Sequence, residues 1–596
     1  MGRIREIFTQ YLKKSNEAST PEERLKYAVR YKLLSLALLG KSAKSSRSFV
    51  PLNKLLSTRC ALLKRDDWSQ FLVVHYARPE SVGNRQVLTD DERRQLRHRK
   101  VTQLIHSGEI GKGARRLAQP EIRDGDRLSS EEMLDKLRAL HPVRNPQIAS
   151  LLTPEMQREL EEFQASPENH VTIDIKRLLS LKILRHKLIK GGFTKTRYEH
   201  LAALLEVNRS EQSPAARQFA EHYVRYLEML VNGNLPDAFY GILADVEATG
   251  IQKPKASSKD IRPIGFNDID RRLLFAYLTP IAEEETRQRF AAASQVANQP
   301  SAAEKYIFSV QAGLEACRSH DMGDLDAKAA FQKVPTDFLL YSVYKAHPWL
   351  YPFVSRVYGK NRHVFVNLDH NVYEFTASMG VTQGCVGAGY LYNLVTVPLL
   401  ERIREVINLC RTAAHAPIVG AAAHADQSQS QQSNFSYTPA LSDLQGAGGR
   451  LGLSQLRQQH RRRFHAQEDR PDLSIECGAS YAYYDNVTFH SVPDAFDAVM
   501  DVVLQLGPQY GYELNMSKTK VLLGARASRE LALERKQQLM ERYGLPDNCV
   551  RIHPDNCTDD TEKDKFGLAL LGGYVGHPGF IRAGLQEKII QLTEEK

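Results

Sequence analysis

The sequence predicts an α+β fold, in which helices pack on antiparallel sheets and a helical N-terminal region precedes them. Within residues 172–231 the apolar positions recur at helical spacing, with Phe219, Tyr223 and Leu227 on one face and a stop at Asn232-Gly233. Later in the chain, short β-branched and aromatic runs alternate with helical stretches. Helical segments followed by strands mixed with helices are typical of the α+β class.

Three further segments predict individual elements. LSSEEMLDKLRALHP (128–142) predicts a capped helix that ends before a proline. VFVNLD and VYEFTAS predict a hairpin around Asn371, and SYAYYDNVTFH predicts another with Asp485-Asn486 as its turn. An aspartate at such a tip is good turn chemistry, and it is also held rigidly enough to bind a metal ion.

Two long regions have unusual composition. Roughly the first 165 residues are charged and helical, and residues 101–119 predict two short helices joined at Gly108 and Gly111. Residues 411–478 are rich in Gln, Ser and Arg and poor in β-branched residues. Such a segment buries too little apolar surface to become ordered, so we expect a low-complexity, disordered insertion.

The overall composition restricts the class of protein. The chain has 596 residues, enough for more than one domain, and a formal net charge of +10, which suits a polyanionic partner. Basic residues cluster in 93–100 and in 182–197, although each run alone is more often a solvated helix face. The longest apolar stretch, 33–39, is too short to cross a bilayer, so we expect a soluble, intracellular protein.

The seven cysteines are scattered and indicate a reducing compartment rather than a disulfide framework. Cys549, His553 and Cys557 have C-x3-H-x3-C spacing, but a fourth ligand of matching spacing is absent. We therefore expect no structural zinc from this motif.

Four motifs accompany the Asp485 hairpin in a definite order along the chain. They are MGDLDAKAAF (322–331), GVTQGCVGAGYLYN (380–393), GYELNMSKTKVLLG (511–524) and LLGGYVG (570–576). Each is weak alone, but the ordered set resembles the reverse transcriptases of non-LTR retrotransposons. It is most similar to the site-specific class with a restriction-like endonuclease, such as the spliced-leader-associated elements of trypanosomatids.

The resemblance covers roughly residues 101–588. TRYEHLAALLE (196–206) and QKPKASSKDIRPIGFNDIDRRLL (252–274) resemble segments of the fingers region of this family. Residues 347–366 and 381–400 match its later segments with few gaps.

The resemblance implies two catalytic carboxylates, Asp326 and Asp485, that hold two Mg²⁺ ions, with Mn²⁺ as an alternative. Phosphoryl transfer by two divalent ions about 3.5–4 Å apart needs such oxygen ligands on rigid strands. Asn486 occupies the place of the family's second hairpin aspartate, which removes one negative charge from the site. Asp324 lies on the same strand face as Asp326 and is a potential substitute.

The resemblance also implies a nucleotide pocket and a primer grip. In D-x-x-x-A-F, Phe331 corresponds to the aromatic residue that excludes the ribose 2′-OH. The other implied nucleotide-binding residues are Lys253, Arg262, Gln383, Gly384 and Lys518, and the implied primer grip is Leu571, Gly572 and Gly573.

The predicted domain order follows from these assignments. Residues 1–165 form a basic helical extension, 166–320 the fingers region, 321–410 and 479–580 the two parts of the palm, and 581–596 the start of a truncated thumb. The low-complexity insertion, 411–478, separates the two palm parts.

Three functions remain open from the sequence. The first is an RNA-directed DNA polymerase that uses an RNA template, a DNA primer and dNTPs in the nucleus. The second is a catalytically silent nucleic-acid binder of the same lineage, which Asn486 favours. The third is an RNA-dependent RNA polymerase, against which Phe331 argues because RNA synthesis needs room for the 2′-OH.

Overall fold

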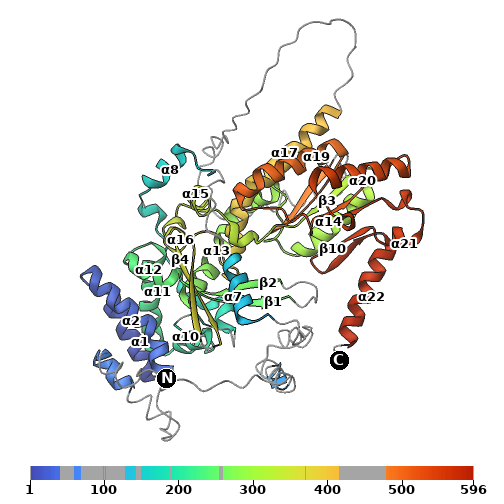
Figure 1. The fold of residues 1–596 in the computed structure, drawn as a ribbon. Helices are drawn as coiled ribbons and strands as arrows, with labels where there is room; N and C mark the ends of the chain where they lie inside the picture. The colour runs from blue at the N-terminus through green and yellow to red at the C-terminus, as the bar shows by residue number, and fades with distance from the viewer. Residues whose placement is uncertain are drawn as a thin grey trace.

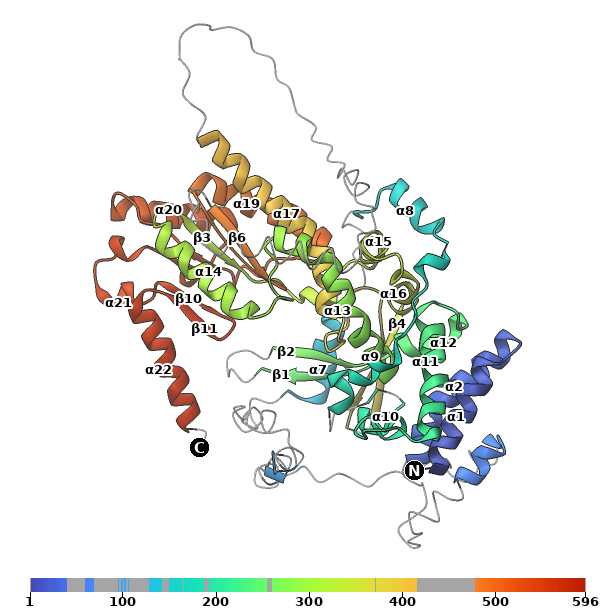
Figure 2. The same ribbon diagram turned by 180° about the vertical axis from the view of Figure 1, so that it is seen from behind.

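The computed structural model describes residues 2–39, 59–68, 128–141, 150–164, 166–186, 194–253, 260–369, 371–414 and 478–594, with a few short pieces between them. One half of the molecule contains the N-terminal helices, coloured blue to green in Figure 1, and a four-stranded sheet coloured green to yellow. The other half, mostly orange and red, contains a five-stranded and a two-stranded sheet, and Figure 2 shows the same division from behind. Two long helices, α13 (Ile269–Ala292) and α17 (Ala388–Ala414), pack against each other at the centre.

The N-terminal helices α1 (Gly2–Asn16) and α2 (Pro21–Leu39) pack as a pair, and α1 also packs on α11 (Pro214–Val231). Lys32 of α2 is buried, and its ammonium group donates to the carboxylates of Asp268 and Asp270. A buried charge is tolerated only when it is paired in this way, so these contacts join α2 to the start of α13.

Two predicted helices of this half are confirmed. The helix with Phe219 and Tyr223 on its buried face is α11, which ends at Val231 just before Asn232-Gly233. The capped helix is α7 (Ser130–Ala139), in which Ser129 and Glu132 form a reciprocal capping box. The remaining helices of this half are α8 (Pro154–Glu161), η2 (Pro167–Asn169), α9 (Ile175–Ser180), η3 (Lys182–Arg185), α10 (Tyr198–Leu205), α12 (Asp237–Ala244) and α16 (Tyr351–Tyr358).

The four-stranded sheet has the order β2-β1-β4-β5. Its strands are β1 (Val246–Gln252), β2 (Ile261–Phe266), β4 (Arg362–Leu368) and β5 (Asn371–Ala377). The predicted hairpin around Asn371 is the β4–β5 pair, with Leu368 opposite Asn371. A separate apolar cluster, including Leu134 and Leu137, packs α7 onto this sheet.

The five-stranded sheet has the order β6-β7-β3-β8-β9. Its strands are β3 (Asp321–Leu325), β6 (Gly478–Tyr483), β7 (Asn486–Ser491), β8 (Lys520–Leu522) and β9 (Val550–Arg551). Strands β6, β7, β3 and β8 are antiparallel, but β9 pairs parallel with β8, and β1 pairs parallel with β4, so both of these sheets are mixed where the sequence predicted antiparallel ones. The helices and turns near this sheet are α14 (Ala302–Ala316), η4 (Ala330–Lys333), α15 (Thr336–Ala346), α19 (Pro493–Leu506), η6 (Gly507–Tyr510), α20 (Arg529–Tyr543), η7 (Asp547–Cys549), η8 (Pro554–Asn556) and α21 (Asp560–Lys563).

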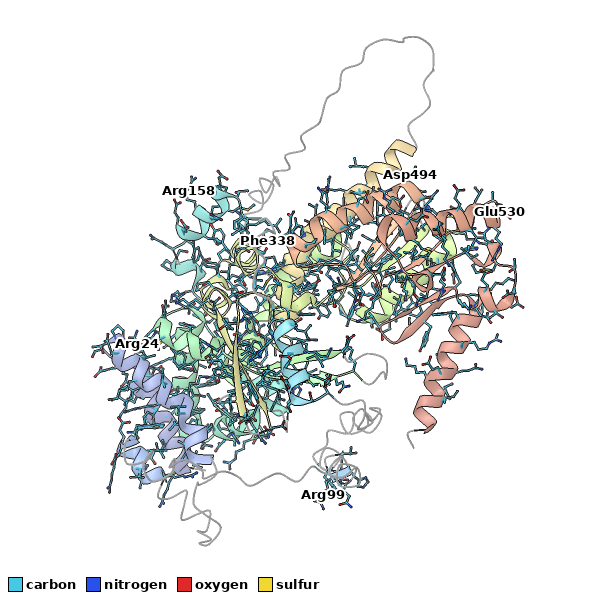
Figure 3. The ribbon with its side chains drawn as sticks, viewed as in Figure 1. Arg24, Arg99, Arg158, Phe338, Asp494 and Glu530 are labelled. Atoms are coloured by element: carbon cyan, nitrogen blue, oxygen red, sulfur yellow. The ribbon has the colours of Figure 1, made fainter. Side chains whose placement is uncertain are left out.

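The third sheet is the hairpin of β10 (Gly567–Leu570) and β11 (Gly573–Gly576), followed by α22 (Pro578–Glu594). An apolar cluster that includes Tyr306, Val310 and Phe566 packs this hairpin and the five-stranded sheet against α14. In Figure 3, Glu530 of α20 lies at the opposite side of the molecule from Arg24 of α2.

The structure corrects the limits of the predicted insertion, residues 411–478. Helix α17 continues to Ala414 and β6 begins at Gly478, so the two ends of the predicted insertion 411–478 belong to regular elements. The segment between them lies outside the described residues, as do nearly all of residues 101–119 and most of the basic run 93–100.

Candidate functional site

Asp326 and Asp485 lie at the same edge of the five-stranded sheet. Asp326 directly follows β3, and Asp485 lies in the turn between β6 and β7. Because β3 and β7 are neighbours, with Leu325 opposite Val487, the two carboxylates are brought together from positions 159 residues apart in the sequence (485 − 326). Both side chains are partly buried.

The predicted Asp485-Asn486 turn is wrong by one residue. The turn residues are Tyr484 and Asp485, and Asn486 opens β7 opposite Tyr483. The turn is shifted because the hairpin register pairs Asn486 with Tyr483. The side-chain nitrogen Nδ2 of Asn486 also donates to the carbonyl oxygen of Tyr483 at 3.3 Å. Tyr484 takes the positive φ that the tight turn needs, 54°.

A buried glutamine stabilises this strained turn. Gln295, from the segment after α13, accepts a hydrogen bond from the Tyr484 amide (3.1 Å) and donates to the Tyr484 carbonyl oxygen (3.4 Å). The backbone of Val296 and Ser294 also pairs with Ala482 of β6, at 2.9 and 3.0 Å. The segment after α13 therefore acts as an additional edge for the hairpin.

A tyrosine connects the backbones that carry the two carboxylates. The hydroxyl group of Tyr512 lies 3.1 Å from the carbonyl oxygen of Asp485 and 3.3 Å from that of Leu325, the residue before Asp326. Its side chain is buried, with 2% of its surface exposed. The sequence placed Tyr512 in a motif but gave it no role, and it gave none to Gln295. Neither residue type indicates chemistry by itself.

Burial is the main cause of the raised pKa values of Asp326 and Asp485. It raises the pKa of the Asp326 carboxyl, against the opposing effect of Lys518 and Lys253. Burial likewise raises the pKa of the Asp485 carboxyl, and the nearby charge of Asp326 adds to the increase. Neither carboxylate forms an ion pair within the part of the chain that the structure describes.

Three cationic side chains from other elements surround the carboxylates. Lys253 follows β1, Arg262 lies in β2, and Lys518 precedes β8; all three contribute to the pKa of Asp326, of Asp485 or of both. Asp260 holds two of them, since its carboxylate lies 3.1 Å from the Lys518 ammonium and 3.7 Å from that of Lys253. The pKa of Lys253 is lowered by burial and by the neighbouring Lys518.

Phe331 lies next to the hairpin tip. Its ring stacks on that of Tyr392 in α17, with centroids 5.0 Å apart, and lies 6.4 Å from that of Tyr484. The backbone carbonyl of Phe331 accepts a hydrogen bond from Val381 at 2.7 Å, which joins it to the Gln383 motif.

Gln383 and Gly384 pack closely on β2. The carbonyl oxygen of Gln383 accepts a hydrogen bond from the Gly265 amide at 2.8 Å. Gly384 has φ +107°, and a Cβ atom there would lie 2.7 Å from the carbonyl oxygen of Gly265. Only glycine fits this position, because both the backbone conformation and the close approach exclude a side chain.

The predicted primer grip forms the turn of the two-stranded sheet. Leu571 and Gly572 have φ of 49° and 88° and connect β10 to β11, and Gly573 begins β11. The Lys588 ammonium group of α22 donates to the Gly572 carbonyl oxygen. This hairpin is a separate sheet from the one that carries the carboxylates.

Asp324, the potential substitute for the lost aspartate, has its own partners. Its carboxylate accepts a hydrogen bond from Thr488 at 3.0 Å, and the Thr488 hydroxyl lies 2.5 Å from that of Tyr306 in α14. Burial, with a further contribution from Asp326, raises the pKa of Asp324 to about 7. At neutral pH this group is partly protonated, so it replaces only a fraction of the charge that Asn486 lacks.

The C-x3-H-x3-C residues have individual roles. The Cys549 sulfur accepts a hydrogen bond from Lys520, His553 Nδ1 accepts one from the Asp555 amide, and Cys557 donates to the His553 carbonyl oxygen.

Among the described helices, none is long and apolar enough to span a bilayer.

The chain was compared with known proteins. No protein-family model and no curated protein matches it. Among solved structures it is similar to apo telomerase from Candida tropicalis truncated from its C-terminal domain, with 10% identity and a TM-score of 0.30 over 63% of this chain and 82% of that chain. It is also similar to the telomerase of that organism in complex with a TWJ fragment of telomeric RNA, with 10% identity and a TM-score of 0.28 over 68% and 75% of the two chains.

Proposed function

We propose that this chain is an RNA-directed DNA polymerase of the non-LTR retrotransposon lineage. The observation that carries the proposal is the meeting of Asp326 and Asp485 with three cations, Lys253, Arg262 and Lys518. These five residues come from five separate segments of the chain. Paired carboxylates beside a cluster of cations suit a reaction in which an anionic phosphate chain is bound and cleaved.

The carboxylate pair fits divalent metal ions. Both groups are partly buried, the charge of Asp326 raises the pKa of Asp485, and neither is ion-paired among the described residues, so a cation there would relieve unfavourable charge. Carboxylate oxygens are the ligands that Mg²⁺ prefers. Two such ions on Asp326 and Asp485 would neutralise the charge that develops at the transferring phosphate and on the leaving group.

The remaining residues bind and orient the nucleotide in this proposal. Lys253, Arg262 and Lys518 hold the triphosphate by charge, and Asp260 keeps the two lysines in position. The primer 3′-hydroxyl group loses its proton to solvent and its oxygen forms a bond to the α-phosphorus, while the bond from that phosphorus to the bridging oxygen breaks and pyrophosphate leaves. Phe331 lies under the sugar, where its ring excludes a 2′-hydroxyl group, and this favours dNTPs over ribonucleotides.

Asn486 favours a second candidate, a catalytically silent nucleic-acid binder. Its side-chain amide is directed into the hairpin by the hydrogen bond to Tyr483, and it lacks the negative charge of a carboxylate. Nucleic-acid binding would depend strongly on salt under either candidate, because displaced counterions dominate it.

Primer extension by the purified chain on an RNA template with a DNA primer separates the two candidates. We expect weak extension with dNTPs that is stronger in Mn²⁺ than in Mg²⁺, and a rise of about tenfold in Asn486→Asp, which restores the missing charge.

A nuclear location and target-primed synthesis follow from the proposed lineage.

The matched control is Asp494→Asn, an exposed carboxylate in the first turn of α19 that should leave extension unchanged. No extension by either the parent or Asn486→Asp, with salt-dependent RNA binding intact, would establish the silent binder instead.

A further inference from the structure

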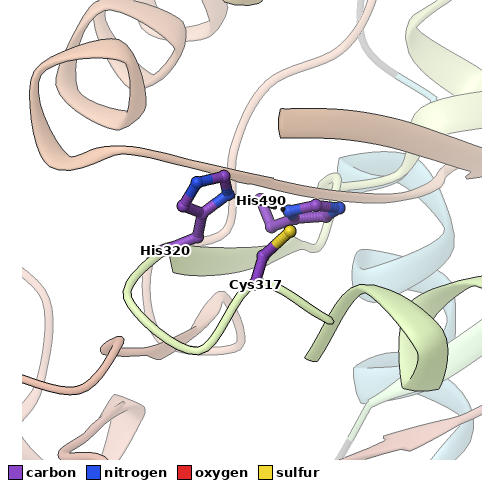
Figure 4. A group of neighbouring side chains, drawn as sticks. All are labelled: Cys317, His320 and His490. Atoms are coloured by element: carbon purple, nitrogen blue, oxygen red, sulfur yellow. Dashed lines mark hydrogen bonds between the residues drawn. The ribbon is translucent and has the colours of Figure 1, made fainter. Parts of the chain in front are cut away.

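A second group of metal-ligating side chains lies at the other end of β3. It consists of Cys317, His320 and His490, and no motif in the sequence singled it out. Figure 4 shows the cysteine sulfur and the two imidazole rings turned toward a common space. His320 precedes β3 by one residue and Asp326 follows it by one, so about 20 Å of strand separates the two groups at about 3.3 Å per residue.

The first two residues of the group come from one rigid turn with C-x2-H spacing. Cys317 caps α14, and its amide donates to the Gly313 carbonyl oxygen at 3.0 Å. The His320 amide in turn donates to the Cys317 carbonyl oxygen at 3.0 Å. Short turns of this spacing are common in structural zinc sites, because they direct two side chains to the same point.

The neighbouring segment 524–526 supports this turn. The Ala525 amide donates to the Arg318 carbonyl oxygen at 2.6 Å, and an Arg526 guanidinium nitrogen donates to the Ser319 carbonyl oxygen at 3.0 Å. The turn is therefore held in one conformation by contacts on its outer side.

The third residue comes from the middle of the sheet. His490 lies in β7 directly opposite Met322 of β3, and only 1% of its surface is exposed. Its ring is fixed by Gly313 of α14, where an added Cβ atom would lie 2.8 Å from Nε2. Tyr481 of β6 stacks on the ring, with centroids 6.1 Å apart.

The distances suit a small ion with nitrogen and sulfur ligands. The Nδ1 atoms of His320 and His490 are 3.2 Å apart, and one ligand atom from each of the three residues lies within 4.8 Å of the others. Two nitrogens bound tetrahedrally to zinc at about 2.0–2.1 Å lie about 3.3 Å from each other. Burial lowers the pKa of both imidazoles, that of His490 to about 4, so both are neutral near pH 7 and able to bind a metal.

We propose that Cys317, His320 and His490 bind one Zn²⁺ ion, which connects the end of α14 to strands β3 and β7. Two imidazoles and a thiolate are ligands that zinc prefers and that Mg²⁺ does not. On binding, the Cys317 thiol loses its proton to the solvent, and the imidazole that donates from Nδ1 moves this proton to Nε2, so that both Nδ1 atoms can bind the ion. Cys317 is only partly buried, which leaves the fourth position for a water molecule.

Metal titration of the full chain tests this site. Cobalt(II) is the probe, because a thiolate ligand produces an intense near-ultraviolet charge-transfer band that oxygen ligands do not. We expect one equivalent of Co²⁺ to produce this band, one equivalent of Zn²⁺ to remove it, and millimolar Mg²⁺ to leave it unchanged. Cys317→Ser should abolish the band, and His490→Asn should weaken zinc binding at least about tenfold.

Cys557→Ser is the matched control, because Cys557 is also partly buried and donates to a backbone carbonyl oxygen at 3.4 Å. It should keep the band. A parent chain without the band would overturn the site, since the Nδ1–H···Nδ1 hydrogen bond of the two imidazoles would then suffice to explain their geometry. A band that persists in Cys317→Ser would also overturn it, and the spectrum of the parent decides the question even if a variant fails to fold.

Discussion

At one end of the β3–β7 strand pair lie Asp326 and Asp485, and at the other end lie His320 and His490. The carboxylate end is faced by lysine and arginine side chains from the other half of the molecule and carries a half-buried turn. The imidazole end is covered by α14 and by the turn before β3. Under the two proposals, oxygen ligands would thus lie beside the cationic side chains that would bind an anionic substrate, and nitrogen and sulfur ligands would lie where α14 covers the sheet.

This difference shows how one rigid strand pair can serve two purposes. Strand β3 is central in its sheet, with β7 on one side and β8 on the other, so both of its ends are held by backbone hydrogen bonds. A rigid scaffold is needed for chemistry at one end and for a structural link at the other. The ligand types and the surroundings then decide which ion each end prefers.

The largest expected effect concerns the carboxylate end. Asp326→Asn and Asp485→Asn should each reduce primer extension by on the order of 1,000-fold or more, because each removes a charge that two divalent ions require. The measurement is extension in Mg²⁺ and in Mn²⁺, made in the parent and in the Asn486→Asp background. Retained extension by either variant would contradict the assignment of Asp326 and Asp485 as metal ligands. The carboxylate end of the strand pair would then have no catalytic role that sets it apart from the imidazole end.

A smaller effect is expected at the pocket beside that end. Phe331→Ala should reduce the preference for dNTPs over ribonucleotides by about tenfold or more, because the ring that faces the sugar is removed. The measurement is the ratio of kcat/KM for a dNTP to that for the matching ribonucleotide. An unchanged ratio would show that Phe331 supports Tyr392 and Tyr484 without contacting the sugar.

Tyr512→Phe tests whether the carboxylate end depends on its backbone link. The loss of the hydroxyl group leaves the carbonyl oxygens of Leu325 and Asp485 without this donor, so we expect about a tenfold fall in kcat with little change in KM. Tyr543→Phe is the control, because its hydroxyl lies 3.2 Å from the Asp497 carbonyl oxygen, on α19. An equal fall in both variants would indicate a general loss of stability.

The smallest effect on catalysis is expected at the imidazole end. Removal of zinc by a soft-metal chelator should lower the free energy of unfolding, by about 2.7 kcal/mol if zinc was present at 100 times its Kd. Extension in excess Mg²⁺ should remain within about twofold, because the ion is about 20 Å of strand away from Asp326. Calorimetry and primer extension on the same sample check both statements, and a parallel loss of activity would show that the two ends are coupled.

Local features of the fold were predictable because they depend on neighbours in the sequence. The α11 stripe of Phe219 and Tyr223, the Ser129–Glu132 capping box and the β4–β5 hairpin all follow from interactions over a few residues. The hairpin of Asp485 was also predicted, but its turn was placed one residue late. Turn chemistry favours Asp-Asn, and only the β6–β7 register, supported by Gln295, places the positive φ at Tyr484.

The sequence by itself singled out Asp326 and Asp485 as candidates within ordered motifs, and it determined local elements such as α7, α11 and the β4–β5 hairpin. The tertiary structure alone decided that Lys253 and Lys518 share Asp260, that Tyr512 joins the backbones of both acids, and that His490 meets Cys317. Lys253 and Asp260 are close in the sequence, but Lys518, Tyr512 and His490 lie tens to hundreds of residues from their partners, so no local periodicity relates them. The order of strands in the sheet, set by burial of the whole core, is what brings them together.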